Sequence, residues 1–341
     1  MKRLFVCLLL CLLLCSCVTV QVETPAAEPE VSGSLEVHYI DVGQADCILL
    51  QCGGAHMLID GGNVEDSDLV VSYLLDQEVT TLDYVVNTHA HEDHVGGLPG
   101  VLAVFETKNI WCPVKEYSSS CFEDFVKYAD QQDLELVCPE PGSTYDLGGA
   151  EVTVLGPVRD DYDTNNSSIV LRVDYGATSF LFTGDAETTA EKDILEAGYD
   201  VSATVLKVGH HGSETSSSYQ WLREVGAEYA VIQVGTGNSY GHPHELILSR
   251  LRDADMTVYR TDLQGHIVCT SDGKAVSFET GRTVAVTNPT EEPETFIGNK
   301  NSKKFHLDTC SGLPKEENQV IFESYDDAVE AGYEPCSKCM G

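Results

Sequence analysis

Residues 88–94, with the sequence Thr-His-Ala-His-Glu-Asp-His, constrain this chain more than any other stretch. They follow an apolar, β-branched run at 82–87 that is typical of a buried strand, and they precede an apolar segment from residue 95 that can form a helix. Side chains at such a strand-to-helix turn fan out over the end of a sheet instead of entering its core. The sequence therefore predicts a polar site at a sheet edge.

The side chains of this turn are metal ligands by type and by spacing. His89 and His91 are two positions apart in extended backbone, so they point the same way, and Asp93 and His94 can face a second point as the chain turns. Imidazole nitrogen and carboxylate oxygen are ligands that zinc, manganese and iron accept. The alternative is a polar loop that is merely rich in histidine, but the density of ligands favours a metal site.

Composition sets limits on the partners of the chain. Of its 341 residues, 42% are hydrophobic, which is enough for one large or two unequal domains with ordinary cores. The formal net charge is -35. Such a surface repels polyanions at long range, although a cleft lined with dications attracts phosphate locally. Charge alone therefore argues against nucleic-acid binding.

The N-terminus has the character of an export signal. Lys2 and Arg3 precede an apolar run at 4–14, which is too short to be a stable bilayer span. We therefore expect a signal peptide of the lipoprotein type at 1–16 and an exported protein.

The sequence Leu-Cys-Ser-Cys at 14–17 resembles a bacterial lipobox, in which the cysteine after a small residue is lipidated. Cys17 is the candidate and Cys15 is the alternative. Residues 17–34 would be a disordered tether between a lipid anchor and the folded domain, which would lie on the extracellular face of the cell membrane. Plain secretion is the alternative.

From residue 35 onward, strand and helix patterns alternate, which predicts an α/β fold. The early part contains predicted strands at 35–40, 47–51 and 57–60 and a helix at 66–77. The later part contains predicted strands at 179–183, 203–208 and 229–234, a helix at 243–252 with Pro243 in its first turn, and a hairpin at Asp272-Gly273.

The polar motifs occur in the order seen in metallo-β-lactamase-fold hydrolases. They are Asp-Val-Gly-Gln-Ala-Asp at 41–46, Ile-Asp-Gly-Gly at 59–62, the histidine motif, Phe-Thr-Gly-Asp at 182–185 and Lys-Val-Gly-His-His-Gly-Ser at 207–213. In detail the chain resembles the extracellular hydrolase domain of ComEC-type competence proteins over residues 35–282. The resemblance implies an αββα sandwich with metals at one edge of its two sheets, and a metal-dependent hydrolase.

The resemblance also implies two divalent metal ions, zinc or manganese, that share one carboxylate. Their ligands would be His89, His91 and Asp185 for the first metal, and Asp93, His94, Asp185 and His210 for the second. Two such cations roughly 3.5–4 Å apart can hold a bridging hydroxide as the nucleophile. Asp60 would be a buried acceptor that orients the histidine loop.

Further residues are assigned to catalysis or to the substrate. His211 would lie behind the ligands or donate a proton, with a surface imidazole as the alternative. In the ComEC-type branch the Asn-x-Tyr-Gly-His-Pro run borders the active site. Asn238 and His242 could therefore hydrogen-bond a phosphate or protonate a leaving oxygen, as His211 could, with an ordinary helix-capping loop as the alternative. The catalytic set is thus Asp93, His211 and His242, and Ser213 is assigned with Asn238 to the substrate.

The chain departs from the family pattern at one ligand. Many family members carry a histidine between the two central motifs, where this chain has Asp-Thr-Asn-Asn-Ser-Ser at 163–168. The Asn-Ser pattern matches the ComEC-type branch but leaves the first metal short of a protein ligand. We expect that metal to be weakly held, completed by water or Asn166, or absent, and a site richer in oxygen to tolerate manganese.

Residues 283–295 have no apolar period and are predicted to be a linker to a separate module at 296–341. The module contains one imidazole and three thiols with the spacing of a structural zinc site: His306, Cys310, Cys336 and Cys339. A unit this short needs such a metal to fold. It resembles the metal-binding domain of Ada-type DNA alkylation-response proteins, with a histidine at 306 in place of a cysteine, so methyl transfer is not expected. A disulfide plus a free thiol, or a module that mainly binds a partner, are the alternatives.

The remaining cysteines of the body form either disulfides or buried free thiols: Cys47, Cys52, Cys112, Cys121, Cys138 and Cys269.

Together these features predict a surface-anchored, metal-dependent phosphodiesterase or nuclease acting on DNA or nucleotides. The ComEC-type motifs, the Ada-like module and the lysines at 300, 303 and 304 favour nucleic acid, and the net charge opposes it. The alternatives are an ester, lactone or β-lactam hydrolase, and a non-catalytic binding lipoprotein of a DNA-uptake system. The sequence identifies no protein partner.

Overall fold

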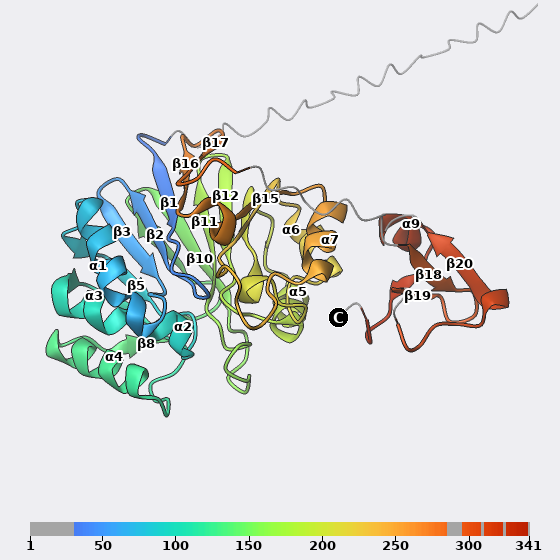
Figure 1. Ribbon diagram of the computed structural model, residues 1–341, viewed down its shortest axis with the longest axis horizontal. Helices are drawn as coiled ribbons and strands as arrows, with labels where there is room; N and C mark the ends of the chain where they lie inside the picture. The colour runs from blue at the N-terminus through green and yellow to red at the C-terminus, as the bar shows by residue number, and fades with distance from the viewer. Residues whose placement is uncertain (1–30, 285–294, 308–309, 323–324, 340–341) are drawn as a thin grey trace, which may run out of the picture.

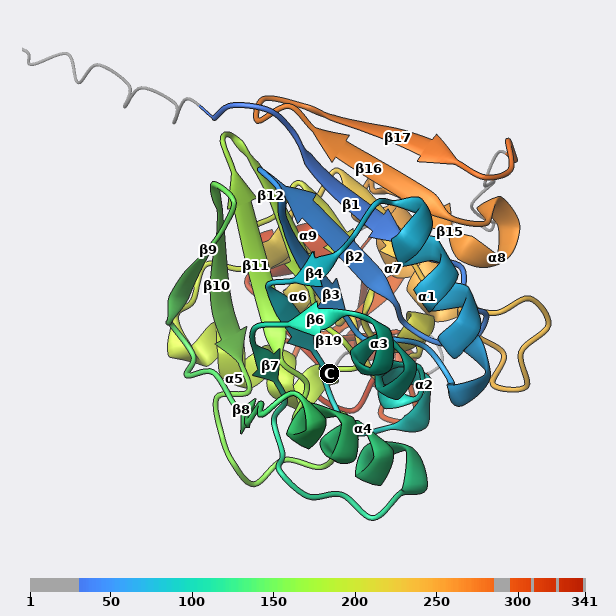
Figure 2. The ribbon, with the colours of Figure 1, turned by 90° about the vertical axis from the view of Figure 1, so that its left-hand side faces the viewer.

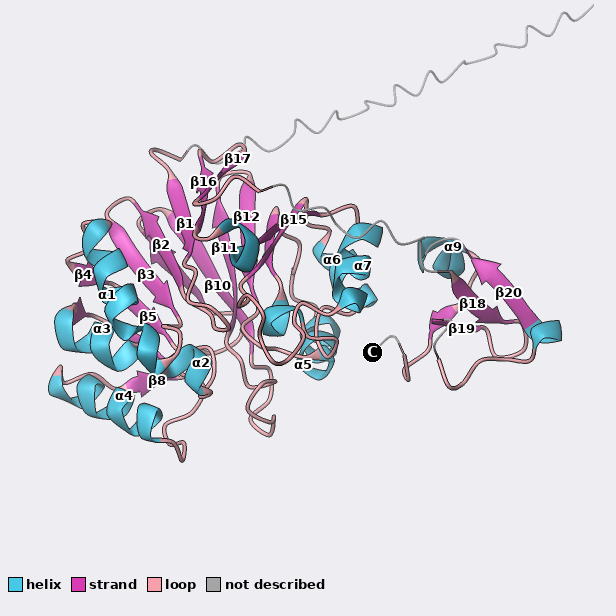
Figure 3. Cartoon of the chain, viewed as in Figure 1, coloured by secondary structure: helices cyan, strands magenta, loops and turns pink. Residues whose placement is uncertain are grey.

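The computed structural model describes residues 31–284, 295–307, 310–322 and 325–339. Two β-sheets pack face to face, and helices cover the outer face of each, so that the layers run helix, sheet, sheet, helix (Figures 1 and 3). The prediction of an αββα sandwich is confirmed. A smaller sheet with one helix forms a C-terminal module.

The first sheet has eight strands in the order β17-β16-β1-β2-β3-β5-β7-β8. These are β1 (Leu35–Tyr39), β2 (Ile48–Cys52), β3 (Ala55–Ile59), β5 (Tyr84–Val86), β7 (Ile110–Trp111), β8 (Leu136–Val137), β16 (Ile267–Ser271) and β17 (Val276–Thr280). Strands from β17 to β3 pair antiparallel, and those from β3 to β8 pair parallel. A two-stranded sheet joins β4 (Thr81–Leu82) to β6 (Glu106–Thr107).

The second sheet has seven strands in the order β15-β14-β13-β12-β11-β10-β9. These are β9 (Thr144–Leu147), β10 (Ala150–Gly156), β11 (Val170–Tyr175), β12 (Thr178–Phe182), β13 (Val205–Lys207), β14 (Tyr229–Ile232) and β15 (Thr257–Arg260). Alternate residues of both sheets form the central core, in which Val37 and Tyr39 of β1 meet Phe180 and Phe182 of β12.

Helices α1 (Ser67–Asp76), α2 (Glu92–Val95), α3 (Leu98–Val104) and α4 (Ser120–Gln131) cover the first sheet (Figure 2). Helices α5 (Thr188–Ala197), α6 (Tyr219–Val225) and α7 (Glu245–Asp253) cover the second, and α8 (Thr261–Gln264) precedes β16. Each covering helix buries an apolar stripe, such as Phe122 and Phe125 of α4. His244 is the N-cap of α7, so the prediction that Pro243 lies inside this helix is wrong.

The loops that carry the polar motifs meet at one edge of the sandwich. Most of them follow β3, β5, β12, β13 and β14, all of which have a parallel neighbour, whereas the 41–46 motif follows β1, which pairs antiparallel. Because the carboxyl ends of neighbouring parallel strands lie on the same side of a sheet, their loops converge there. The fold thereby gathers side chains that are far apart in the sequence.

The C-terminal module has the strand order β20-β18-β19-β21. It contains β18 (Phe296–Asn299), β19 (Lys304–Leu307), β20 (Gln319–Phe322), β21 (Glu334–Pro335) and α9 (Tyr325–Glu330). Its core continues into the sandwich through Tyr219, the first residue of α6. The Tyr219 ring lies 5.3 Å from that of Phe296 and stacks on that of Tyr325 at 5.1 Å.

Among the described residues, no helix has the length and apolar character needed to cross a bilayer. The predicted signal peptide, with the lipidation candidate Cys17, lies outside the described residues, as does most of the predicted linker. The six body cysteines all lie in the described part of the chain and are unpaired there.

Candidate metal centre

The histidine loop is anchored by Asp60, which directly follows β3. Its buried carboxylate accepts hydrogen bonds from the backbone N–H and the hydroxyl of Thr88, each at 2.7 Å. The same carboxylate lies 2.8 Å from Nδ1 of His94. Nδ1 therefore donates the proton, and the Nε2 lone pair of His94 is left for a ligand role.

Ligand atoms of Asp93, His94, Asp185 and His211 converge beyond this loop. One atom from each lies within 4.8 Å of all the others. Nε2 of His94 is 3.3 Å from Oδ1 of Asp185, and Nε2 of His211 is 3.3 Å from Oδ2 of Asp93. Two imidazoles and two carboxylates at these separations are a donor set that zinc or manganese accepts.

The residues of this cluster fit a metal ion. Nε2 of His94, Nε2 of His211 and Oδ1 of Asp185 are buried without a hydrogen-bond partner among the described residues. An unsatisfied buried polar group costs about 1–3 kcal/mol. A single divalent cation between these atoms would satisfy all of them, which explains why they converge.

The two neighbouring histidines lie at similar distances from Asp185 Oδ2, 3.6 Å for His210 and 3.7 Å for His211, but in different surroundings. The resemblance implied His210 as the metal ligand and His211 as a residue behind it. In the structure His211 is buried within the cluster, whereas the His210 side chain is 22% exposed and its Nε2 lies 3.6 Å from Oδ2 of Asp185. The backbone is left-handed at both residues, with φ of 51° and 54°, so the turn directs the second imidazole inward.

His211 is held by a buried network that the sequence analysis did not identify. Its Nδ1 lies 3.0 Å from the carbonyl oxygen of Gln233 and 3.2 Å from Oδ1 of Asp46. The other oxygen of Asp46 forms a buried ion pair with Lys207, the last residue of β13. These acceptors keep the proton on Nδ1, so Nε2 faces the cluster. The signal available in the sequence was a lysine within a predicted buried strand. Such a lysine needs an acidic partner, and the 41–46 motif contains acids.

The carboxylates decide the charge of these histidines. Burial opposes protonation, but Asp185 together with Asp60 outweighs it for His94, whose pKa lies well above its usual value. Asp185 and Asp46 likewise raise the pKa of His211 to about 10. The negative potential of these carboxylates attracts a proton and also attracts a metal cation. The proton and the metal compete for the same histidine nitrogen atoms.

The first metal position of the prediction is less complete. His89 is buried, with its Nε2 3.0 Å from Nδ1 of His91 and 3.9 Å from Oδ2 of Asp185. Asp185, which belongs to the main cluster, is thus also the carboxylate nearest to His89 in this contact. A side chain at Gly184, where φ is 50°, would approach Thr88 to 2.9 Å, so glycine is needed for Asp185 to reach this place.

Asn166 does not complete this position, contrary to one of our expectations. Its amide nitrogen donates to both carboxylate oxygens of Asp163, and its amide oxygen accepts from the backbone of Glu187 and Ala190 at the start of α5. The neighbouring Asn165 lines the cleft instead, and its Oδ1 has no hydrogen-bond partner among the described residues.

A cleft of about 340 Å³ opens over the cluster. Residues that line it include Asp93, Asp185 and both adjacent histidines, with Gln44, Tyr240 and His242 on the opposite wall. The backbone N–H of Gly235 donates to Oε1 of Gln44, which fixes the Gln44 amide so that its nitrogen faces Nδ1 of His242 at 3.4 Å. Burial, with a smaller contribution from the neighbouring His211, lowers the pKa of His242 to about 4. His242 is therefore neutral, with its proton on Nε2.

Two predicted substrate contacts are structural in this fold. The amide nitrogen of Asn238 donates to the carbonyl oxygens of Gly235 and His242, and its oxygen accepts from the backbone of Tyr240 and His242. Ser213 is buried, with its hydroxyl 3.1 Å from that of Thr215, and is not among the described residues that line the cleft. Both side chains have their bonding capacity filled by the loops they hold.

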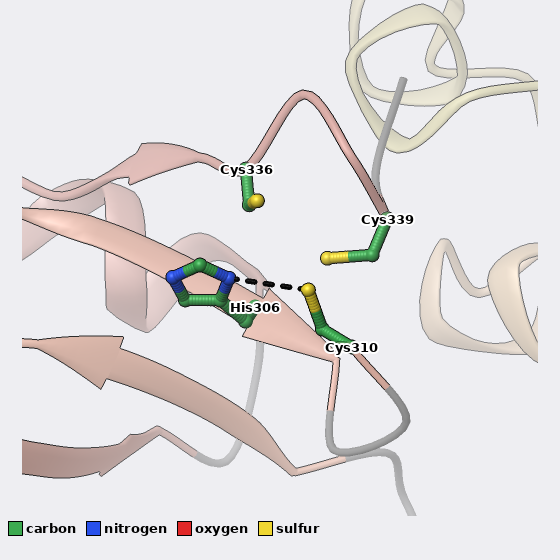
Figure 4. A group of neighbouring side chains, drawn as sticks. All are labelled: His306, Cys310, Cys336 and Cys339. Atoms are coloured by element: carbon green, nitrogen blue, oxygen red, sulfur yellow. Dashed lines mark hydrogen bonds between the residues drawn. The ribbon is translucent and has the colours of Figure 1, made fainter. Parts of the chain in front are cut away.

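The C-terminal module contains a second cluster. Figure 4 shows the imidazole and the three thiols around one point, and one ligand atom from each lies within 4.8 Å of the others: His306, Cys310, Cys336 and Cys339. A set of three thiols and one imidazole suits tetrahedral zinc. The lysines beside it contact their own module, since Lys303 lies over the Tyr333 ring and Lys304 pairs with Glu334.

Comparison with known proteins identifies both parts. The family model of the Metallo-beta-lactamase superfamily matches residues 40–235. The chain belongs to this superfamily. The model described as the metal binding domain of Ada matches residues 281–340.

Within the superfamily the chain is similar to competence proteins. ComE operon protein 3 of Bacillus subtilis (strain 168) is 30% identical over 70% of this chain and 33% of its own length. Competence protein ComA of Neisseria gonorrhoeae is 33% identical over 71% of this chain and 33% of its own length. The chain thus spans about a third of the curated relatives it matches. The solved structure of the metallo-beta-lactamase fold protein YhfI from Bacillus subtilis has a TM-score of 0.49 at 15% identity and covers 70% of this chain and 99% of YhfI.

The buried ion pair behind His211 yields a testable prediction. Lys207→Met would remove the cationic partner of the buried Asp46 and leave only His211 beside it, so we expect a loss of about 3–5 kcal/mol in the free energy of unfolding, measured by urea denaturation. Lys108→Met is the matched control, because Lys108 and Asp83 form a solvent-exposed ion pair, and its midpoint should hardly move. Equal losses in the two variants would show that the buried ion pair contributes no more to the free energy of unfolding than the exposed one.

The cysteine cluster yields a second prediction. In Cys310→Ser, Cys336→Ser the module should lose its zinc, so metal analysis should find one zinc fewer per chain and limited proteolysis should cut at 296–341 while 35–282 persists. Cys138→Ser, which removes an exposed thiol outside the cluster, is the control and should leave zinc content unchanged. An unchanged zinc content in the double variant would contradict the assignment.

Proposed function

We propose that this member of the superfamily is a metal-dependent phosphodiesterase that acts on DNA or nucleotides and holds two divalent metal ions. The observation that carries the proposal is the convergence of buried ligand atoms from His94, Asp185 and His211, which lack hydrogen bonds among the described residues, beside an open cleft that Asp185 and His211 line. Asp93 and His91 reach the same cleft, so ligands for a second cation are at hand.

Divalent cations held here would activate water and neutralise negative charge on a phosphate. The protein groups have complementary tasks. Asp60 and Asp46 fix the tautomers of His94 and His211, so their lone pairs stay directed at the centre. Neutral His242 lines the cleft, and its remaining N–H would donate a hydrogen bond to a substrate oxygen.

The character of the cleft favours a phosphodiester over the alternatives. Its walls are formed by imidazoles, carboxylates and amides, which would make a poor pocket for the apolar body of a lactone or ester. The similarity to competence proteins supports a substrate with nucleotides. A non-catalytic binding lipoprotein would not need a cluster with this many unsatisfied ligand atoms.

We also propose that the protein is lipid-anchored through Cys17 on the outer face of the cell membrane. The support is the lipobox-like sequence after a short apolar run and the polar, Pro- and Glu-containing stretch that precedes β1. A tether of this kind would keep the catalytic domain near the membrane while leaving its cleft accessible.

The proposed activity is tested with the mature chain and bis(4-nitrophenyl) phosphate, single-stranded DNA and double-stranded DNA, with zinc and manganese supplied separately. We expect hydrolysis to require added metal and to fall by more than about 100-fold in Asp93→Ala, His94→Ala, because these residues are ligands. Asp124→Ala, which changes an exposed acid on α4, is the control. Absence of hydrolysis from a chain that binds metal would overturn the proposal and favour the ester hydrolase or the binding protein.

The anchor is tested by labelling cells with a radioactive fatty acid. The label should be incorporated into the full-length chain, and Cys17→Ala should abolish it and release the protein into the medium. Cys15→Ala should retain the label. Labelling lost only in Cys15→Ala would move the lipid to that residue, and labelling absent from the unaltered chain would support plain secretion.

A further inference from the structure

The metal centre opens into two adjoining cavities. The inner one, of about 340 Å³, lies over the ligands, and the outer one, of about 610 Å³, lies between the loop after β1 and the segment before α1. Gln44, Glu92, Asp93 and Tyr240 line both cavities. A substituent of a substrate held at the metal centre can therefore extend into the outer cavity.

The outer cavity has acidic walls. Asp41, Glu65, Asp66 and Glu92 line it, and no lysine or arginine of the described residues lines either cavity. Glu65 and Glu92 are exposed. Asp41 is paired with Arg282 at 3.2 Å. Positive charge at the cleft would therefore come from the metal ions themselves, and it is confined to the floor.

This distribution of charge distinguishes substrates by their number of phosphates. Electrostatic interactions are screened beyond about 8 Å at physiological ionic strength, so the cleft walls matter more than the distant net charge. Consecutive phosphates of a nucleic acid strand advance by about 3.4 Å along the helix axis, so the phosphate next to one held at the metals stays within reach of the cleft walls. One phosphate at the metals is attracted, but its neighbours along a strand would lie against unpaired carboxylates. Proteins that bind DNA place lysine and arginine at these positions instead.

Tyr240 provides a surface for an uncharged group. Its side chain is 67% exposed, it lies at the junction of the two cavities, and its ring stacks on that of His242 with centroids 5.6 Å apart and an interplanar angle of 25°. A flat neutral group, such as a nucleobase or another aromatic ring, could pack on its open face. The cleft thus combines one site for a phosphate with one aromatic platform.

We infer that the cleft selects compact phosphodiesters with a single negative charge, such as a dinucleoside monophosphate, and that Glu65 and Glu92 discriminate against polynucleotide strands. This inference rests on the proposed phosphodiesterase function and narrows its substrate class. The acidic wall acts on substrates by repulsion, and Tyr240 acts by contact.

The test compares three substrates with the metal-loaded mature chain: bis(4-nitrophenyl) phosphate, thymidylyl-thymidine without terminal phosphates, and a thymidylate 20-mer. We expect kcat/KM for the dinucleotide to exceed the value per bond for the 20-mer by at least about 10-fold. Raising the salt concentration from about 0.05 to 0.5 M should increase the relative rate on the 20-mer, because it screens repulsion. A protein that attracts DNA shows the opposite dependence.

Variants test which residues cause the preference for the dinucleotide over the 20-mer. Glu65→Lys should raise the ratio of 20-mer cleavage to bis(4-nitrophenyl) phosphate cleavage by at least about 3-fold, and Tyr240→Ala should raise KM for the dinucleotide. Glu123→Lys, the same charge reversal at an exposed position of α4, should leave the ratio unchanged.

Equal or better cleavage of the 20-mer per bond, or a ratio that Glu65→Lys does not change, would overturn the inference while the phosphodiesterase function stands. Failure to cleave any of the three substrates with metal bound would overturn the proposed function itself, and the inference with it.

Discussion

The buried contacts of the outer histidine nitrogens, which donate to acceptors deeper in the protein, are the interaction on which this site depends. Nδ1 of His94 donates to Asp60, and Nδ1 of His211 donates to the carbonyl oxygen of Gln233 and lies 3.2 Å from Asp46. Both acids are themselves neutralised or bonded by neighbours, Asp60 by Thr88 and Asp46 by Lys207. Without these contacts the imidazoles could rotate or change tautomer, and their lone pairs would no longer point to a common centre. The orientation of these metal ligands is thus fixed by residues that lie deeper in the protein.

The same contacts connect the site to the sandwich. Asp46 lies in the loop between β1 and β2 of the first sheet, and Lys207 ends β13 of the second. The Asp46–Lys207 pair therefore spans the two sheets at the edge where the loops converge. Relative movement of the sheets would separate a buried ion pair, which is costly. The geometry of the centre and the packing of the two halves stabilise each other.

Much of this arrangement could be predicted from the sequence, and the rest could not for physical reasons. Strand periodicity placed β1, β3 and β12 within a few residues, and the density of histidine and aspartate identified the metal site. The choice between His210 and His211 depended on two consecutive left-handed residues, a conformation that sequence patterns do not indicate. Asn238 was assigned to the substrate by the resemblance, and Asn166 was one of the groups that could complete the first metal. In the structure both amides bond backbone groups instead, which depends on tertiary contacts that the sequence does not show.

The contact between the two domains has a consequence for how the protein would fail. Tyr219 belongs to the hydrolase domain but is buried in the core of the module, against Phe296 and Tyr325. If the module came apart for want of zinc, the sandwich would expose an apolar patch at the start of α6. Loss of the structural zinc would then promote self-association of chains whose catalytic half is still folded, so solubility would report the state of the module.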